Sequence, residues 1–337
     1  MKSEIILLGH GSGGKLSHDL LEHLVLPLLS DRPADNQNDA AVLPPLCGRL
    51  ALTTDSYVVD PVVFPGGNIG DLAIHGTIND LAMSGARPVA ISVGLIIEEG
   101  LSVQTLRLIL ESMRSAADAA GVKIVTGDTK VVPRGKADKI FINTTGLGSI
   151  EHDLEITGSS ARPGDRILIN GTIGDHGMAV LSCREGLHLE SPLATDSAPL
   201  HGLVALLIQA VGSDLHVLRD PTRGGVATTI KEIAQQSAVG VTLQETALPL
   251  HKTVAGACAI LGLDPLFVAN EGKLLAFVAP QAAERALAAM QNHPNGRHAA
   301  IIGEVTAVHA GKVQLATAIG GLRAIEMLAG EQLPRIC

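Results

Sequence analysis

The sequence predicts a two-domain protein of the α/β or α+β class, and three observations lead to this prediction. Segments with strand character alternate with segments of helical periodicity in both halves, which excludes all-α and all-β folds. The 337 residues suffice for two domains of ordinary size. Hydrophobic residues make up 46% of the chain, yet it has one Tyr, four Phe and no Trp, so the core must be aliphatic.

In the first half, a short apolar run over residues 5–8 leads into a glycine loop, and a helix is expected over 16–29. Ser102 is placed to cap a helix, while Gly85 and Gly121 are placed to end helices. The other elements expected here are helices over 68–84 and 102–120, and strands over 49–54, 88–97, 122–125 and 139–145.

The second half begins after the turn-forming segment Arg162–Asp165. We expect a strand over 166–170, after which the glycine-rich segment Gly171–Gly177 opens a helix. The further elements expected are helices over 198–211, 223–236, 251–261 and 281–291, and strands over 239–243, 274–278, 299–305 and 312–315. The predicted domains are 1–155 and 156–325, followed by a flexible tail over 326–337, because disorder concentrates at termini.

Composition and charge exclude several classes of protein. A net charge of −9 without a basic stripe, together with few aromatic residues, argues against a nucleic-acid partner. No apolar run reaches the roughly 18 residues of a membrane span, and the first residues lack the apolar core of a signal peptide. A cytoplasmic setting is therefore expected.

The four cysteines, Cys47, Cys183, Cys258 and Cys337, are scattered without a CxxC pair. This spacing excludes a zinc ribbon and gives no disulfide framework. We expect the first three to be structural residues. Cys337, on a short tether at the end of the sequence, is expected to stay a free thiol outside the folded core.

The glycine loop Gly9–Lys15 matches two phosphate-binding patterns as text and fails both on context. No second strand ending in an acidic residue follows, as a dinucleotide fold requires, and Leu16 stands where a P-loop needs Ser or Thr. Unhindered backbone N–H groups and a lysine still suit an oxyanion. The loop therefore predicts phosphate contact by Gly11, Gly13, Gly14 and Lys15, and the alternative is a flexible loop.

Aspartates recur beside aliphatic strands and glycine-rich turns. Asp39, Asp55, Asp128 and Asp220 are expected in loops, and Asp80 on a helix. Each could be a cap or turn residue. Together they suit Mg²⁺, which bridges protein carboxylates to substrate phosphates.

Eight motifs occur in order along nearly the whole chain. They are His10–Gly14, Thr53–Val59, Phe64–Gly70, Gly76–Ala82, Gly127–Lys130, Asp220–Gly225, Asn270–Lys273 and Pro334–Cys337. This set resembles the HypE family of hydrogenase maturation factors, which make the cyanide ligands of [NiFe]-hydrogenase. That family belongs to an ATP-binding superfamily with aminoimidazole ribonucleotide synthetase, selenophosphate synthetase and thiamine-monophosphate kinase.

The resemblance implies a fold and a set of ligands. N-terminal strands would pair across a homodimer to form a β-barrel, and ATP would lie in the groove between the two domains. ATP and phosphate contacts would come from the glycine loop, Asp55, Asp80 and Thr129. Magnesium contacts would come from Asp39, Asp55, Asp80, Asp128 and Asp220.

The resemblance also implies a reaction. The carbamoyltransferase HypF would load a carbamoyl group onto Cys337, and ATP-dependent dehydration would convert this S-carboxamide into a thiocyanate. Glu271 and Lys130 match the positions that orient and deprotonate the amide. A HypC–HypD iron scaffold would accept the cyanide, and Arg335 and Ile336 would dock the tail.

Alternative interpretations remain for the catalytic candidates Lys130 and Glu271 and for the function of the whole chain. Lys130 could instead contact phosphate, and Glu271 could be a turn carboxylate. The alternative functions are a small-molecule ATP kinase or synthetase of the superfamily, and a non-catalytic thiol carrier. Selenophosphate synthesis is disfavoured because no cysteine accompanies the glycine loop.

Overall fold

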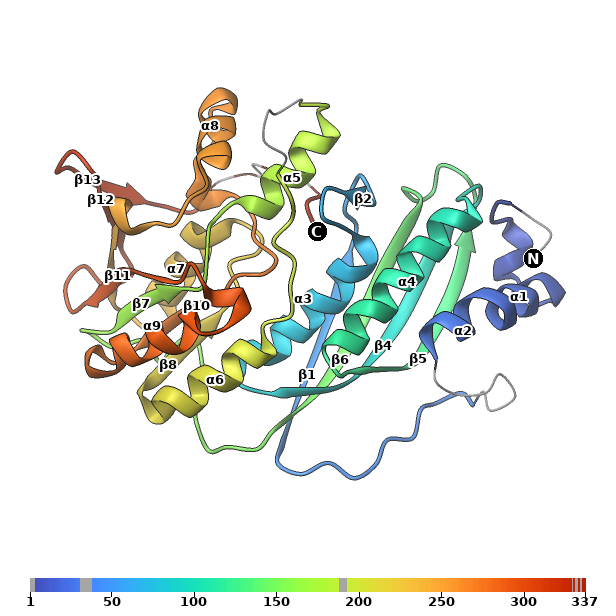
Figure 1. Ribbon diagram of the computed structural model, residues 1–337, viewed down its shortest axis with the longest axis horizontal. Coiled ribbons are helices and arrows are strands. Elements are labelled where there is room, and N and C mark those ends of the chain that lie inside the picture. The colour runs from blue at the N-terminus through green and yellow to red at the C-terminus, as the bar shows by residue number, and fades with distance from the viewer. Residues whose placement is uncertain (1–3, 31–37, 188–192, 329, 331–332, 334) are drawn as a thin grey trace.

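The computed structural model describes residues 4–30, 38–187, 193–328, 330, 333 and 335–337, which form two α/β halves lying side by side (Figure 1). The first half contains a four-stranded sheet in the order β1-β6-β4-β5. Its strands are β1 (Arg49–Tyr57), β4 (Arg87–Glu98), β5 (Lys123–Val132) and β6 (Ile140–Ile150). Only the pairing of β4 with β5 is parallel in this sheet. A small hairpin, β2 (Val63–Phe64) and β3 (Gly67–Asn68), precedes the first long helix.

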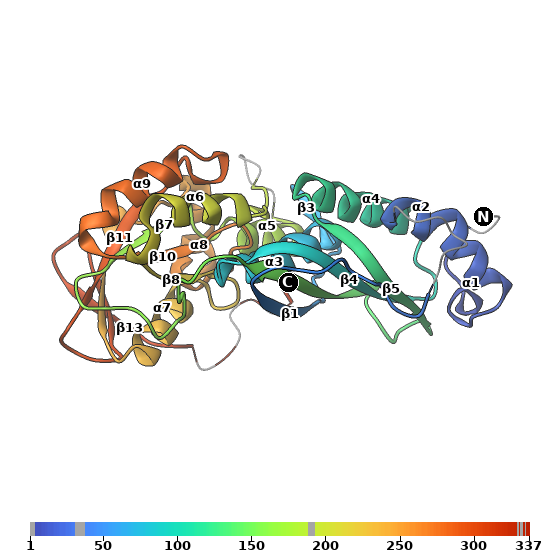
Figure 2. The same ribbon diagram turned by 90° about the horizontal axis from the view of Figure 1, so that it is seen from below.

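Two long helices, α3 (Ile69–Met83) and α4 (Val103–Ala119), cover one face of this sheet (Figure 2). The sheet residues Ile91, Val93 and Leu95 belong to the same buried cluster as apolar residues of both helices. Beside β5 lie a 3₁₀ turn (Leu8–Gly11), α1 (Lys15–Leu20), a π-helical turn (Leu21–Val25) and α2 (Leu26–Leu29). On the opposite face of the sheet Leu50 and Leu52 are exposed, so the face away from the helices is an open face.

The second half contains a seven-stranded sheet in the order β13-β12-β9-β11-β7-β10-β8. Its strands are β7 (Arg166–Ile169), β8 (Leu215–Arg219), β9 (Gly240–Gln244), β10 (Leu275–Val278), β11 (Ala300–Thr306), β12 (Val313–Ala316) and β13 (Leu322–Ile325). The helices are α5 (Asp175–Arg184), α6 (His201–Val211), α7 (Gly225–Gln236), α8 (Lys252–Leu261) and α9 (Ala283–Gln291). Helices α6 and α9 pack on one face of the sheet and α7 on the other, so the sheet has a buried cluster on each face.

Helix α3 begins and ends where its local chemistry predicts. Asn68 caps it by accepting from the Gly70 N–H at 2.8 Å, and the Asp71 carboxylate accepts from the Asn68 N–H at 2.7 Å. Gly85, at φ +74°, follows the last turn, a conformation that glycine adopts without strain. Near the end of this helix, the Asn79 side chain bonds main-chain groups of the second half, while Asp80 accepts from Thr53 of β1.

Most expected elements are confirmed within one to three residues, including the Ser102 cap of α4. Two expectations about aspartates are wrong, because Asp55 lies within β1 and Asp128 within β5 rather than in loops. Pairing with β6 and β4 supplies the backbone hydrogen bonds of these residues and overrides the low strand propensity of aspartate. Strands β2, β3, β8 and β13 were not expected, and the short hairpin of β2 and β3 lies where a loop was expected over 60–67. In the described part of the chain, no helix is long and apolar enough to cross a membrane.

The fold predicts a cost for opening a cavity under α3. Leu72 of α3 is fully buried, so Leu72→Ala should lower the free energy of unfolding by about 2–5 kcal/mol. Ile260 on α8 is 82% exposed, and Ile260→Ala should change the free energy of unfolding by no more than about 0.5 kcal/mol. Denaturant unfolding of both variants measures the difference, and equal effects would contradict the described packing of α3.

Candidate active site

A cavity of about 330 Å³ lies between the two halves and collects four acidic side chains and one thiol. Asp55 comes from β1, Asp80 from α3, Asp220 from the loop after β8, and Glu271 from the loop before β10. The thiol is that of Cys337, the last residue of the sequence. The structure thus brings together three of the predicted magnesium ligands and two of the three predicted catalytic residues.

The acidic groups are poorly solvated, which makes their charged forms costly. Burial, followed by the neighbouring Asp80 carboxylate, raises the pKa of Asp220 to about 7. Burial also raises the pKa of Asp80, against a hydrogen bond from the Thr53 hydroxyl at 2.7 Å. The pKa of Glu271 is raised well above its usual value by burial and then by nearby carboxylates. Two arginines, Arg219 and Arg223, also line the cavity and supply part of the compensating positive charge. Burial nevertheless raises the pKa of these carboxyl groups, which favours their protonated form or a bound cation.

The main chain of Glu271 is held on both sides. Its N–H donates to Asp196 Oδ1 at 3.0 Å, and its carbonyl accepts from Asn79 Nδ2 at 3.2 Å. Its side-chain Oε1, by contrast, is buried with no hydrogen-bond partner among the residues that the structure describes. A buried polar atom without a partner is costly, so this oxygen is available to a substrate group.

Cys337 is largely buried, which corrects the expectation of a thiol outside the folded core. Burial, followed by the charge of Glu271, raises the pKa of this thiol to about 12. The docked sulfur is therefore protonated at neutral pH and is a weak nucleophile. This position suits a sulfur that already carries a group better than one that must attack a donor.

The end of the chain docks through its main-chain carbonyls. The Arg335 carbonyl accepts from Arg184 Nη2 at 2.6 Å, the Ile336 carbonyl bonds His176 Nε2 at 2.9 Å, and the Cys337 oxygen accepts from the Val58 N–H at 3.1 Å. Figure 1 shows this end of the chain between the two halves.

Two side chains complete this docking. Ile336 is 3% exposed and belongs to the main core cluster of the first half. The Arg335 guanidinium donates to the Val58 carbonyl at 2.9 Å and pairs with Asp138. The expectation that Arg335 and Ile336 dock the tail is thus confirmed, while Pro334 lies outside the described residues. Flexibility of the tail stays a prediction.

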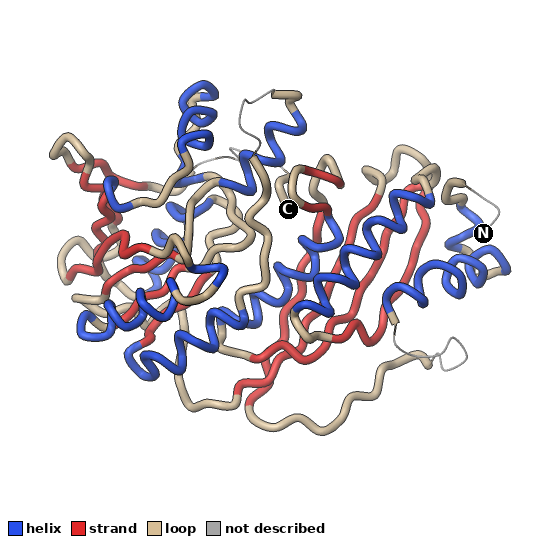
Figure 3. Tube along the Cα trace, viewed as in Figure 1, coloured by secondary structure: helices blue, strands red, loops and turns tan. Residues whose placement is uncertain are grey.

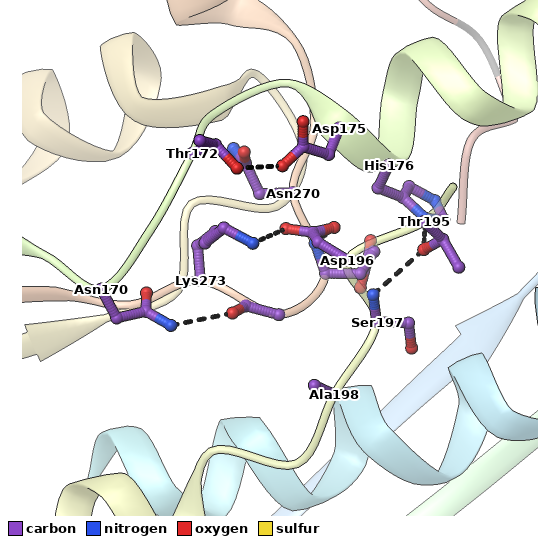
Figure 4. Close-up of polar contacts among 12 residues, drawn as sticks. Asn170, Thr172, Asp175, His176, Thr195, Asp196, Ser197, Ala198, Asn270 and Lys273 are labelled. Carbon is purple, nitrogen blue, oxygen red and sulfur yellow. Dashed lines mark hydrogen bonds and ion pairs between the residues drawn. The ribbon is translucent and has the colours of Figure 1, made fainter. Parts of the chain in front are cut away.

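A polar network beside the cavity contains residues that the sequence did not single out as functional (Figure 4). His176 Nδ1 bonds the Thr195 hydroxyl at 2.7 Å, and Lys273 Nζ donates to Asp196 Oδ2 at 2.8 Å. Burial lowers the pKa of His176, so the neutral imidazole donates from Nε2 to the tail and accepts at Nδ1. The motifs Gly171–Gly177 and Asn270–Lys273 were the only sequence signals for this network.

The remaining predicted residues lie elsewhere. A second cavity, of about 350 Å³, is bordered by Gly11, Gly13 and the β5 residues Asp128, Thr129 and Lys130. It lies between the N-terminal helices and the edge of the first sheet. Within one chain, the glycine loop therefore does not reach the cavity that contains Cys337.

Asp128 and Lys130 point to the open face of the sheet. They pair in register with Gly94 and Ile96 of β4, whose neighbours Val93 and Leu95 face the helices. The two side chains form an ion pair at 2.7 Å and both are exposed. Asp55 faces α3 instead, so β-strand alternation separates Lys130 from Glu271 and Cys337.

The other predicted residues are exposed or remote from the first cavity. Asp39, Gly14 and Lys15 are exposed, and Asp39 lies between two residues that border the second cavity. Among the cysteines, Cys258 is buried as expected for a structural residue. Cys47 and Cys183 are exposed, which makes the same expectation wrong for them.

The first cavity fits a magnesium ion in the type of its oxygen donors, which are carboxylates. Within the described part of the chain, no group of three or more His, Cys, Asp or Glu side chains is arranged to hold a metal ion. Mg²⁺ commonly takes only one or two protein carboxylates and completes its shell with water and phosphate oxygens. Asp55, Asp80 and Asp220 are the residues that would hold it here.

Comparison with known proteins identifies two family models along the chain. The N-terminal domain of AIR synthase related proteins matches residues 37–150, and the C-terminal domain of the same group matches residues 162–316. A relative named carbamoyl dehydratase HypE, from Bradyrhizobium diazoefficiens, is 53% identical over 330 residues, covering 98% of this chain and 95% of the relative.

Solved structures agree with the sequence comparison. A hydrogenase maturation protein HypE in complex with ATP superimposes with a TM-score of 0.94 at 53% identity, covering 98% of this chain and 99% of that one. A chain of a solved HypE–HypF complex also superimposes on this chain, with a TM-score of 0.80 at 48% identity. The match covers 83% of this chain and 90% of that one. The chain therefore belongs to the carbamoyl dehydratase HypE family, within the AIR synthase related proteins.

Proposed function

We propose that this enzyme dehydrates an S-carboxamide on Cys337 to a thiocyanate with ATP, supplying cyanide ligands for the iron of [NiFe]-hydrogenase. The observation that carries the proposal is the docked Cys337 sulfur in the same cavity as Glu271 and three further carboxylates. A solved HypE relative binds ATP, which supports ATP as the co-substrate.

Hydroxide is a poor leaving group, so the amide oxygen must first be converted into a better one. The oxygen attacks the γ-phosphorus of ATP, the bond to the bridging oxygen breaks, and ADP leaves. The nitrogen then loses a proton as the C=N bond forms. Loss of the second proton from nitrogen accompanies cleavage of the C–O bond, so phosphate leaves with the former amide oxygen and the C≡N bond remains on sulfur.

Glu271 is the proposed base for the nitrogen protons. Its Oε1 lacks a partner within the described chain, and its raised pKa makes the ionised carboxylate a stronger base than an exposed glutamate. Mg²⁺, when bound by Asp55, Asp80 or Asp220, would neutralise phosphate charge. Asp39 and Asp128 stay proposed as further magnesium or phosphate contacts.

Lys130 and the glycine loop are proposed to act in a homodimer. Lys130 lies on the open face together with exposed Leu50, Leu52 and Ile96, an apolar surface suited to a second copy of the sheet. In a homodimer, the first sheets of two copies would together form a β-barrel, and this face would be buried inside it. The phosphate contacts would then come from Lys130, Thr129 and the loop residues Gly11, Gly13, Gly14 and Lys15. The alternative role of Lys130 is that of a base for the amide protons.

The thiol chemistry separates loading from dehydration. Docked Cys337 is protonated at neutral pH, so we propose that the tail leaves the cavity to receive its carbamoyl group. The solved HypE–HypF complex of a relative supports HypF as the donor. A HypC–HypD iron scaffold is the proposed acceptor of the cyanide, and the cytoplasm the proposed location.

The proposed carrier role predicts where the carbamoyl group is found. Incubation with carbamoyl-loaded HypF should add one carboxamide to Cys337, and ATP should then remove one water from that adduct. Mass spectrometry of the tail peptide measures both steps. Cys337→Ala should bind ATP yet form neither adduct, and finding the group on Cys47, Cys183 or Cys258 would overturn the assignment.

The proposed base predicts a large loss of rate without loss of nucleotide. Glu271→Gln keeps the size of the side chain and removes its basicity, so single-turnover thiocyanate formation should fall by about 100- to 10,000-fold. Calorimetry should show that ATP still binds. Glu284→Gln, on the exposed surface of α9, is the matched control. An unchanged rate in Glu271→Gln would exclude Glu271 as the base, and ATP turnover that never changes the Cys337 adduct would favour a carrier without dehydratase activity.

The docked tail predicts slow alkylation of its thiol. At pH 8 the exposed Cys47 and Cys183 should react with iodoacetamide at least about 10-fold faster than Cys337, because a thiol with a pKa of about 12 supplies little thiolate. Arg335→Ala removes the bonds to Val58 and should speed the reaction of Cys337, whereas Arg297→Ala on the exposed surface should not. Equal rates for Cys337 and Cys47 would show that the tail is not docked in solution.

A further inference from the structure

A segment without regular secondary structure, Leu193–Leu200, passes between the two halves and is called the crossing segment here (Figure 3). Its Thr195 N–H donates to the Pro65 carbonyl of the first half at 2.9 Å. Further along, Asn79 of α3 donates to the Ala198 carbonyl at 3.0 Å and accepts from the Leu200 N–H at 2.8 Å. The crossing segment is therefore fixed against the first half at three points.

One residue of the crossing segment, Asp196, reaches the loop that carries Glu271 (Figure 4). Its Oδ1 accepts from the Glu271 N–H at 3.0 Å, and its Oδ2 accepts from Lys273 Nζ at 2.8 Å. The Asp196 and Lys273 side chains are 5% and 9% exposed, so each charge needs the other.

Close packing leaves the loop little freedom to move away from Asp196. A Cβ added to Gly272 would lie 1.7 Å from the Asp196 carbonyl oxygen, so this position accepts glycine alone in the described conformation. Asn79 holds the Glu271 carbonyl from the other side. With both main-chain groups of Glu271 bonded and its Oε1 without a partner in the described chain, the main chain is what directs the carboxyl into the cavity.

We propose that Asp196, charge-balanced by Lys273, is a positioning residue that holds the main chain of Glu271 so that its carboxyl faces the Cys337 sulfur. The proposal deepens the dehydratase function proposed above and rests on it. Asp196 does not contact the reacting atoms. Asp196 acts through the Glu271 N–H, and the positive charge of Lys273 offsets the cost of burying the Asp196 carboxylate.

The same segment is linked to the docked tail through His176. Thr195 bonds His176 Nδ1, and His176 Nε2 bonds the Ile336 carbonyl. The residue next to Asp196 therefore helps to place the substrate-bearing tail, while Asp196 places the base. Positioning of both reaction partners by adjacent residues is what an intramolecular proton transfer requires.

Two double variants separate positioning from a purely structural ion pair. Asp196→Asn with Lys273→Met removes both charges but keeps an oxygen at Oδ1 that can accept from the Glu271 N–H. Asp196→Leu with Lys273→Met removes the same charges and that acceptor, with a side chain of similar shape. Positioning predicts that the Asn variant stays within about 3-fold of the unmodified chain, while the Leu variant loses about 10- to 100-fold in rate.

The measurement is single-turnover thiocyanate formation in the full chain after loading with carbamoyl-loaded HypF, over a range of ATP concentrations. The ATP concentration for half-maximal rate should be unchanged in both variants, because neither residue is placed in the nucleotide site. Equal rates in the two variants would mean that Asp196 has only a structural role.

Hydrogen exchange supplies a readout that does not depend on activity. In the unloaded chain, the Glu271 amide should be protected in the Asn variant and exchange faster in the Leu variant, because only the former keeps its acceptor. Equal protection in the two variants would overturn the positioning role even if the unmodified chain formed no thiocyanate. The absence of thiocyanate in the unmodified chain would instead overturn the proposed function and leave the exchange result to decide this inference.

Discussion

The burial of carboxyl groups at the junction of the two halves is the constraint on which the rest of the site depends. Asp80, Asp220 and Glu271 come from three separate elements, and burial raises the pKa of each. Such a cluster is stable only when the surrounding chain fixes its members, because each group would gain solvation by moving outward. For Glu271 this restraint comes from both halves, through Asp196, which is paired with Lys273, and through the Asn79 amide.

The tail places an uncharged side chain, the Cys337 thiol, in the cavity. It docks by main-chain carbonyls and by the apolar side chain of Ile336, and its sulfur stays a neutral thiol beside Glu271. A thiolate here would be repelled by Asp55 and Glu271, whereas an uncharged carboxamide or thiocyanate on sulfur would not. The electrostatics of the cavity thus favour a derivatised sulfur over a reactive one, which agrees with a site for dehydration rather than for loading.

Local chemistry made much of the fold predictable. The Ser102 and Asn68 ends of helices, the positive-φ glycines and the order of the elements follow from short-range signals, and the motifs that contain Asp80, Asp220 and Glu271 identified side chains that do meet. The burial of Cys337 could not be predicted, because it depends on contacts between Ile336 and residues far away in the sequence. The hydrogen bond between Asp196 and the Glu271 N–H was equally hidden, since a segment without regular structure gives no sign of which loop it will contact.

Strand alternation explains why residues that the sequence assigned to one site border two different cavities in the described part of the chain. Asp55 and Asp128 each lie in strands of the same sheet, but Asp55 faces α3 while Asp128 pairs with Gly94 on the open face. A sequence motif gives the types of its residues. It does not tell which face of the sheet each side chain lies on unless the register of the strand is known. Lys130 can therefore meet an S-carboxamide only across an interface or after a rearrangement of the sheet. The exposed Leu50 and Leu52 on the same face favour the interface, because burying them against a second copy removes apolar surface from water at no cost to the helix-covered core.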